Sequence, residues 1–336
     1  MAAILTHILT LAGGVALLIV GGEALVRGAV SLAARLRVSP LVIGLTVVAF
    51  GTSAPELAFN IIAAVKDNDA LSFGNIIGSN IANIGLVLGA AALIRPLHVH
   101  ASLVKREMPI MILVTIGAMI MAIWPLPESV HSGGEGFGRL DGITLLMGFA
   151  VFMLFTVASG QQRQAPLETS FATEVEELVE PGDAKPMWFA LLLFFIGLGM
   201  LVLGGQLAES GAAGLARLWG VSDQLIGLTI VAIATSLPEL AVGLIAARRG
   251  QVDIAVGNVV GSNIFNILLV LGATATVNPV GLPPSGLQSM VVALVLALLL
   301  WPMSRTHGRM LSRVEGALLL LLYVGYLSFE VMRAVR

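Results

Sequence analysis

Two stretches of this chain occur twice. GLTVVAFGTSAPELA at residues 44–58 and GNIIGSNIANIGLVLG at 74–89 return as GLTIVAIATSLPELA at 227–241 and GNVVGSNIFNILLVLG at 257–272. The segments that hold them align without a gap at a constant offset of 183 residues, and 26 of the 46 aligned positions are identical. An ungapped match of this quality identifies an internal repeat, and the repeat decides the architecture.

The composition is that of a membrane protein. Of the 336 residues, 57% are hydrophobic and 11% are charged, and the mean hydropathy is +0.97, whereas soluble domains are about 25% charged. A net charge of -2 without a dense basic tract excludes an electrostatic nucleic-acid interface, and the absence of cysteine excludes thiolate sites. Hydropathy predicts ten transmembrane helices, at about 5–33, 40–65, 72–94, 107–124, 141–160, 187–216, 224–247, 253–275, 286–302 and 314–332.

The spans form two sets of five. We expect an N-terminal repeat at 1–160 with its motif at 44–89, an acidic cytoplasmic linker at 161–186, and a C-terminal repeat at 187–336 with its motif at 227–272. Because five is odd, the second repeat enters the membrane from the opposite side, so a pseudo-two-fold axis in the membrane plane relates the repeats. Twelve of the 17 Lys and Arg residues outside the spans fall on one side, which predicts that both termini are external.

Each motif places a proline inside a span, Pro55 and Pro238. Proline removes an amide donor and clashes with the preceding turn, so we expect a helix break at both. Carbonyl, hydroxyl and carboxylate oxygens at such a break suit Na⁺, Ca²⁺ or Mg²⁺. A charge at mid-bilayer costs about 2.5–3.5 kcal/mol, so two symmetry-related glutamates need a compensating cation or proton. The predicted hydroxyl and carboxylate ligands at the two breaks are Thr52, Ser53, Glu56, Thr235, Ser236 and Glu239.

The third and eighth spans carry a second polar motif, Gly-Ser-Asn-Ile-x-Asn-Ile. Residues four apart share a helix face, so its serine and its second asparagine are predicted to point the same way. Glycines four apart predict a stripe that lets helices approach closely. The polar residues are Ser79, Asn80, Asn83, Ser262, Asn263 and Asn266, and the glycines are Gly74, Gly78, Gly257 and Gly261. Outside the motifs, Glu23 and Arg27 are spaced as an i,i+4 ion pair.

These residues resemble the cation/calcium antiporter superfamily, specifically the prokaryotic sodium/calcium exchangers with two α-repeats, over essentially the full chain. The resemblance implies an all-α membrane protein whose ten helices form two inverted five-helix repeats. It implies exchange of Na⁺ for Ca²⁺ by alternating access, with the first and sixth helices sliding against the other eight. Carried over position by position, the implied ion ligands are Ala49, Thr52, Ser53, Glu56, Ser79, Asn83, Ala232, Thr235, Ser236, Glu239, Ser262 and Asn266.

The chain departs from the family pattern at one position. The resemblance implies that Ala49 and Ala232 contribute backbone carbonyls. It also implies that Glu56 and Glu239 hold the central Ca²⁺. Asn266 stands where such exchangers often have aspartate, and Asn83 is an amide too. An amide offers an oxygen but no charge. Two carboxylates neutralise one Ca²⁺ or two Na⁺, so a third Na⁺ would leave the site positive; the substitution is benign if the aspartate is neutral during transport.

Other functions remain to be compared. Ca²⁺/H⁺ antiport is the main alternative because glutamates bind protons, whereas the Thr-Ser pairs supply neutral oxygens that a proton does not need. A channel usually forms acidic rings by oligomeric symmetry, and an intramembrane protease needs a dyad motif that this chain lacks. We expect a transporter rather than an enzyme, located in the plasma membrane. We expect no cofactor and no obligate protein partner; its partners are the lipid bilayer and the cations Ca²⁺ and Na⁺.

Overall fold

The structure of the chain is a computed structural model, which describes residues 2–36, 38–124, 134–162, 186–221, 226, 230 and 232–335. Within these residues, nine helices are long and apolar enough to cross a membrane, and each coincides with a predicted span to within a few residues. The seventh predicted span, about 224–247, lies partly outside the described residues, as does nearly all of the predicted linker.

In the first repeat, several spans combine α-helical and π-helical segments. Its elements are α1 (Ala2–Leu36), α2 (Pro40–Ile43), η1 (Gly44–Val48), α3 (Ala49–Val65), α4 (Asp69–Ala82), η2 (Asn83–Leu88), α5 (Gly89–Ile94), β1 (Leu97–His98), η3 (Leu103–Glu107), α6 (Met108–Ile123), β2 (Gly136–Phe137) and α7 (Arg139–Gln162). The second repeat contains α9 (Met187–Leu218), α11 (Ala232–Ala234), α12 (Leu237–Arg248), α13 (Val252–Phe265), η5 (Asn266–Leu271), α14 (Gly272–Val277), β3 (Val280–Gly281), α15 (Gly286–Met303), β4 (Met310–Leu311) and α16 (Arg313–Val335).

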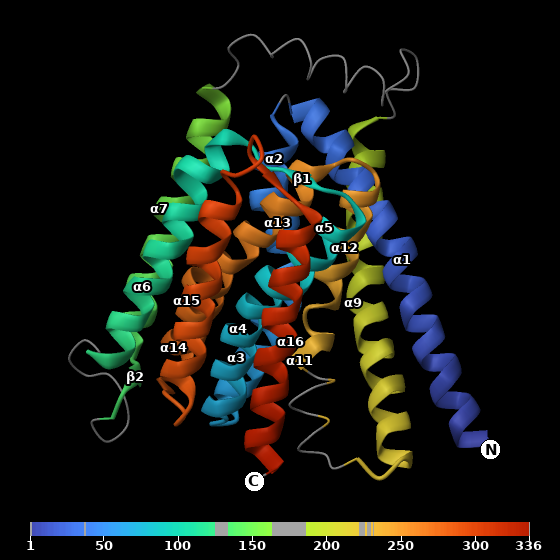
Figure 1. Ribbon diagram of the computed structural model, residues 1–336, viewed down its shortest axis with the longest axis vertical. Helices are drawn as coiled ribbons and strands as arrows, with labels where there is room; N and C mark the ends of the chain where they lie inside the picture. The colour runs from blue at the N-terminus through green and yellow to red at the C-terminus, as the bar shows by residue number, and fades with distance from the viewer. Residues whose placement is uncertain are drawn as a thin grey trace.

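The two repeats are related by pseudo-two-fold symmetry. Asn80 and Asn263, which are 183 residues apart, donate reciprocally: each side-chain amide bonds the other residue's backbone carbonyl, at 3.2 and 3.4 Å. The same offset carries η2 onto η5 and β1 onto β3. The strand pairs β1–β4 and β2–β3 are both antiparallel, and the described ends of the chain lie at one end of the molecule (Figure 1). The predicted fold, two inverted five-helix repeats, is confirmed.

Helices α1 and α9 pack against each other along one side of the molecule (Figure 1). Their contact is made by glycines spaced seven residues apart, and a Cβ atom added to any of them would lie 2.4–2.9 Å from a backbone atom of the other helix. Only residues without a side chain allow backbones to approach this closely within a membrane. These glycines are Gly14, Gly21, Gly28, Gly197, Gly204 and Gly211.

An ion pair also connects α1 to the second repeat. The Arg27 Nε donates to Glu23 at 3.0 Å, as the spacing predicts, and the Arg249 Nε at the end of α12 donates to the same carboxylate at 2.7 Å. All three side chains are partly exposed, and such pairs contribute about 0–1 kcal/mol to stability. The ionic contact therefore positions α1 more than it stabilises the fold.

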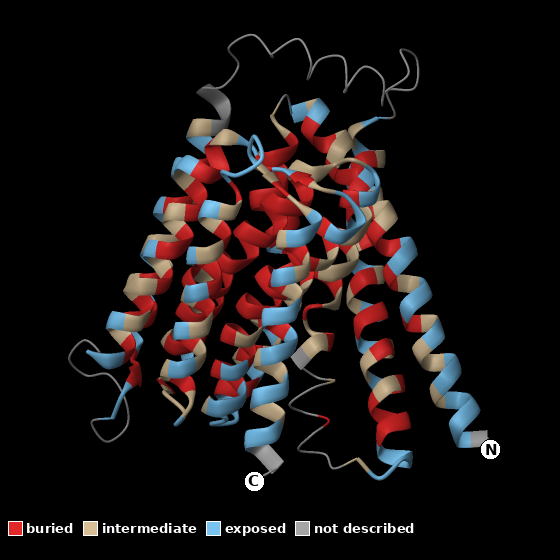
Figure 2. Cartoon of the chain, viewed as in Figure 1, coloured by how far each residue is buried: buried red, intermediate tan, exposed pale blue. Residues whose placement is uncertain are grey.

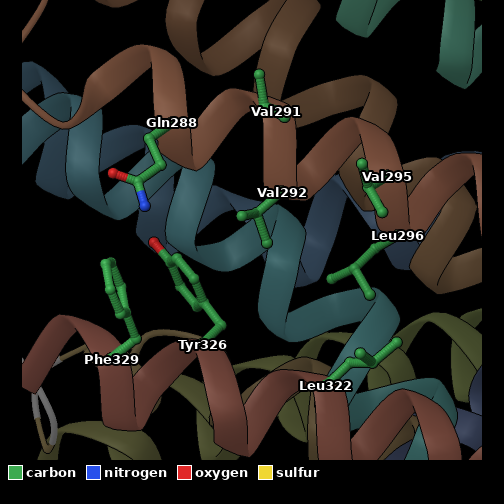
Figure 3. Close-up of a pocket in the computed structure, with 8 residues that line it drawn as sticks. All are labelled: Gln288, Val291, Val292, Val295, Leu296, Leu322, Tyr326 and Phe329. Carbon is green, nitrogen blue, oxygen red and sulfur yellow. The ribbon is translucent and has the colours of Figure 1, made fainter.

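The interior is formed by the spans that carry the repeated motifs. In the most apolar window of each span, 94% of the α13–η5–α14 residues are buried, against 11% in α1, and Figure 2 shows the buried residues gathered at the centre. Helices α6, α15 and α16 expose large apolar side chains on the outside. An apolar groove of about 350 Å³ lies between α15 and α16 (Figure 3) and is lined by Gln288, Val291, Val292, Val295, Leu296, Leu322, Tyr326 and Phe329.

Candidate cation site

In the first repeat, the predicted helix break at Pro55 is absent. Helix α3 runs continuously through this proline, and the irregular segment is instead the π-helical turn η1 at its start. A missing N–H deprives only the Gly51 carbonyl of its helical partner. The helix continues despite this loss, and Gly51, Thr52 and Ser53 pack in the interior. The sequence prediction was therefore wrong at this proline.

In the second repeat, the predicted break is present. Helix α11 ends at Ala234, Thr235 and Ser236 form a turn, and α12 begins at Leu237 with Pro238 in its first turn. Proline is favoured there because the first amides of a helix have no intrahelical partner. Glu239 thus lies in the first turn of α12, next to the free amides and the positive end of the helix dipole.

Glu56 of α3 and Glu239 of α12 lie in the interior. Their exposed fractions are 1% and 0%, and the two carboxylates are close enough to repel each other. Among the described residues, none of their four oxygens has a hydrogen bond of good geometry, although the Thr52 hydroxyl lies near enough to Glu239 to interact with it. Buried carboxylates that lack partners are costly unless a cation or a proton compensates them.

The other predicted ligands share this lack of partners. Of sixteen buried side-chain nitrogen and oxygen atoms without a hydrogen bond in the described part of the chain, eleven belong to predicted ligands. Native proteins leave few such atoms unpaired, so a concentration of them in one place indicates a bound species. The ligands concerned are Ser53, Glu56, Ser79, Asn83, Ser236, Glu239 and Asn266.

Contacts between the repeats bring several ligands together. The Thr52 and Ser262 hydroxyls are 3.5 Å apart, and the Thr52 hydroxyl also donates to the Ala49 carbonyl at 3.4 Å. Gly261 packs directly against Ala49, and Gly257 packs against Leu41, which confirms the predicted glycine contacts for this repeat. The equivalent contacts of Gly74 and Gly78 would involve residue 224 and the side chain of Ala232, which lie outside the described part of the structure.

Ala232 lies where the sequence predicts, whereas Asn80 and Asn263 have another role. Ala232 begins α11, so its backbone precedes the Thr235 turn as predicted; its side chain is outside the described part of the structure. Asn80 and Asn263, which the sequence grouped with the oxygen donors, bond each other's backbone across the pseudo-two-fold axis. Their amide groups therefore join the repeats.

Sequence reasoning missed two asparagines that contact the ligands. The Thr52 hydroxyl donates to Asn258 Oδ1 at 3.2 Å, and the Asn75 amide donates to the Thr235 hydroxyl at 3.1 Å. A signal was present, because Asn75 precedes Ser79 by four residues, one helical turn. The π-helical turns that begin at Asn83 and Asn266 were missed too; such turns occur frequently at functional sites.

Buried oxygen donors at the junction of two inverted repeats define a class of protein, the secondary transporters of small ions. A sequence profile described as "Sodium/calcium exchanger protein" matches residues 6–158 and 189–332. The chain belongs to the sodium/calcium exchanger family and is a multi-pass membrane antiporter.

Individual relatives agree with this assignment. The chain is 41% identical over 317 residues to CaxA of Alkalimonas amylolytica, covering 93% of this chain and 95% of the relative. It is 33% identical over 350 residues to the sodium/calcium exchanger MaX1 of Methanosarcina acetivorans, covering 96% and 98%. A structure of the sodium-calcium exchanger NCX_Mj soaked with Na⁺ and Sr²⁺ matches with a TM-score of 0.81 and 33% identity, covering 97% and 98%. These named exchangers are transporters rather than enzymes.

Proposed function

We propose that this protein exchanges Na⁺ for Ca²⁺ across the plasma membrane by alternating access, with both termini external. Its cation site is formed by Glu56 and Glu239 at the membrane midplane, together with threonine, serine and asparagine oxygens and the carbonyls of Ala49 and Ala232. The glutamates hold Ca²⁺ or share Na⁺, and the neutral oxygens complete the coordination. The related proteins MaX1 and NCX_Mj are both named as sodium/calcium exchangers, which supports this pair of ions.

The observation that carries the proposal is the set of buried, unpartnered oxygens on Glu56, Glu239 and their neighbours. Two carboxylates carry a charge of -2, which one Ca²⁺ or two Na⁺ neutralise. The empty dianionic site is disfavoured in a low-dielectric interior, so the loaded forms cross more readily. This difference couples the two fluxes, because an unloaded carrier returns slowly.

The difference between the repeats supports alternating access. The Thr-Ser-x-Pro-Glu block lies within a continuous helix in the first repeat and at a helix break in the second. In an inverted-repeat transporter, the two repeats exchange conformations when the site opens to the other side. The close glycine-lined contact between α1 and α9 holds these two helices together, so the pair can move as a unit.

The test is ⁴⁵Ca²⁺ uptake into proteoliposomes. Vesicles loaded with Na⁺ are diluted into Na⁺-free medium, and a parallel set carries a pH gradient of either sign with no Na⁺. We expect uptake only with internal Na⁺. The doubly substituted Glu56→Gln/Glu239→Gln protein, reconstituted at the same density, measures leak. Uptake driven by the pH gradient alone would assign Ca²⁺/H⁺ antiport with the two glutamates as proton carriers, and would refute Na⁺ coupling.

A further inference from the structure

The two repeats differ at two neighbouring buried polar positions next to the site. Asn60 of α3 is fully buried, and the offset of 183 places Gly243 at the equivalent position of α12. Its neighbour Ser72 corresponds to Ala255 in the same way. The second repeat therefore lacks both side chains, and a Cβ at Gly243 would lie 2.7 Å from Val87, so no side chain fits there without rearrangement.

Asn60 has a fixed orientation. Its amide nitrogen donates to the Glu56 backbone carbonyl at 2.7 Å and to Asn75 Oδ1 at 2.7 Å, while its own oxygen accepts from the Ser72 hydroxyl at 3.0 Å. A backbone carbonyl only accepts, so the atom that faces Glu56 must be the nitrogen. Both amide hydrogens of Asn60 are then used, and Asn75 must present its oxygen to Asn60.

The orientation of Asn60 sets that of Asn75, which contacts the predicted ligand Thr235. With its oxygen turned toward Asn60, Asn75 presents its nitrogen to Thr235, and the Thr235 hydroxyl accepts that bond at 3.1 Å. In the other repeat the polarity is reversed: the Thr52 hydroxyl donates to Asn258 Oδ1 at 3.2 Å, and the Asn258 nitrogen has no hydrogen bond in the described structure. One hydroxyl therefore donates where its counterpart accepts.

This difference changes what each threonine offers a cation. A hydroxyl has two acceptor lone pairs. Thr52 donates to its asparagine and does not accept from it, whereas Thr235 uses one lone pair to accept from Asn75 at 3.1 Å; the contact of Thr52 with the Ser262 hydroxyl is longer, at 3.5 Å. We propose that Asn60, acting through Asn75, is a positioning residue that weakens Thr235 as a Na⁺ ligand and so makes the two pseudo-equivalent Na⁺ positions unequal. This rests on the proposed function, in which both threonines are ligands.

The test removes Asn60, the asparagine that fixes the orientation of Asn75. In Asn60→Leu, which keeps the branching at Cγ but is larger and has no hydrogen-bonding group, Asn75 is free to turn its oxygen toward Thr235, as Asn258 does toward Thr52. Thr235 then donates and regains a lone pair. Because the difference is one hydrogen bond, we expect the Na⁺ concentration for half-maximal effect to fall about three- to tenfold, while that for Ca²⁺, set mainly by two carboxylates, changes less than twofold.

Two measurements report the effect. Thermal unfolding of the detergent-solubilised protein against Na⁺ or Ca²⁺ concentration gives equilibrium binding, and Na⁺ inhibition of ⁴⁵Ca²⁺ uptake gives the functional value. Ser72→Ala is the matched control: it removes a neighbouring bond of Asn60 but leaves the bond to Glu56 that fixes its orientation, so the Na⁺ response should stay within twofold. If Asn60→Leu does not fold, Asn60→Gly copies the residue of the other repeat.

The outcomes separate the two proposals. An unchanged Na⁺ response in a folded Asn60 variant, or equal shifts for Na⁺ and Ca²⁺, would overturn only the proposal that Asn60 acts on Thr235 through Asn75. A wild-type protein that Na⁺ neither stabilises nor inhibits would overturn the proposed function, and with it the proposed role of Asn60. A purely structural role for Asn60 would lower the unfolding temperature without separating the two ions.

Discussion

Replacing one of the two buried glutamates gives the sharpest test of the charge balance at the site. Glu239→Gln keeps the shape and removes one unit of charge from a residue with no exposed surface. Two unit charges about 4 Å apart at an effective dielectric constant of about 20 interact by about 4 kcal/mol, and a divalent ion by about 8 kcal/mol. The amide oxygen that remains and residual solvation recover part of this, which we take as roughly half.

The expected losses therefore differ between the ions. Ca²⁺ binding weakens by about 4 kcal/mol, or roughly 10³-fold, and Na⁺ binding by about 2 kcal/mol, or roughly 30-fold. Without ions, the variant should unfold at the same or a higher temperature than wild type, because two buried carboxylates that repel each other are reduced to one. The increase in unfolding temperature that Ca²⁺ gives the wild type should disappear.

The assay is Ca²⁺-dependent thermal unfolding combined with ⁴⁵Ca²⁺ uptake, and a second buried glutamate supplies the control. Glu107 is 1% exposed and pairs with Arg106, in a different span from either site glutamate. Glu107→Gln makes the same chemical change away from the site and should leave the Ca²⁺ response within threefold of wild type. Ca²⁺ uptake by Glu239→Gln at near wild-type rates, or equal losses for Ca²⁺ and Na⁺, would refute the reasoning.

Three further perturbations test other parts of the structure. Asn266→Asp adds a third carboxylate and should change the reversal potential or the pH dependence of exchange more than Ca²⁺ affinity; an unchanged reversal potential across both pH and Na⁺ gradients would contradict this. Gly28→Val places a Cβ 2.6 Å from the α9 backbone and should lower both flux and unfolding temperature, whereas Gly13→Val, whose Cβ would meet no atom within 4 Å, should lower neither. Glu23→Gln removes the contact with Arg249 and should cost less than about 1 kcal/mol of stability, while changing turnover in flux assays and leaving Ca²⁺ binding unaltered; reduced Ca²⁺ binding would place Glu23 at the site.

Much of the fold could be predicted from the sequence because its signals are long and repeated. Uninterrupted apolar stretches fix the spans, and an ungapped duplication of five-span units fixes their inverted relation. The burial of Glu56 and Glu239 followed from their place within the spans. The π-helical turns were not predictable, because an extra residue shifts which side chains share a helix face, and this shift leaves no visible pattern in spans that are buried on nearly all faces. The role of Asn75 was missed because a polar residue on a helix gives no sign of its partner on another repeat.

The Thr-Ser-x-Pro-Glu block shows why a local motif does not determine the local structure. Pro55 lies inside a helix and Pro238 at the start of one, although the residues around them are nearly identical, so the surroundings decide between the two forms. In the first repeat, Gly51 lies close to α9, and Asn60 ties the Glu56 carbonyl to α4. The second repeat has Ala234 and Gly243 at these positions. Ala234 also lies near α9, so the restraint that its break lacks is the one made by Asn60. The sequence difference between the repeats thus biases which one holds a continuous helix, and in the proposed transport cycle Asn60 would favour the state described here over its mirror image.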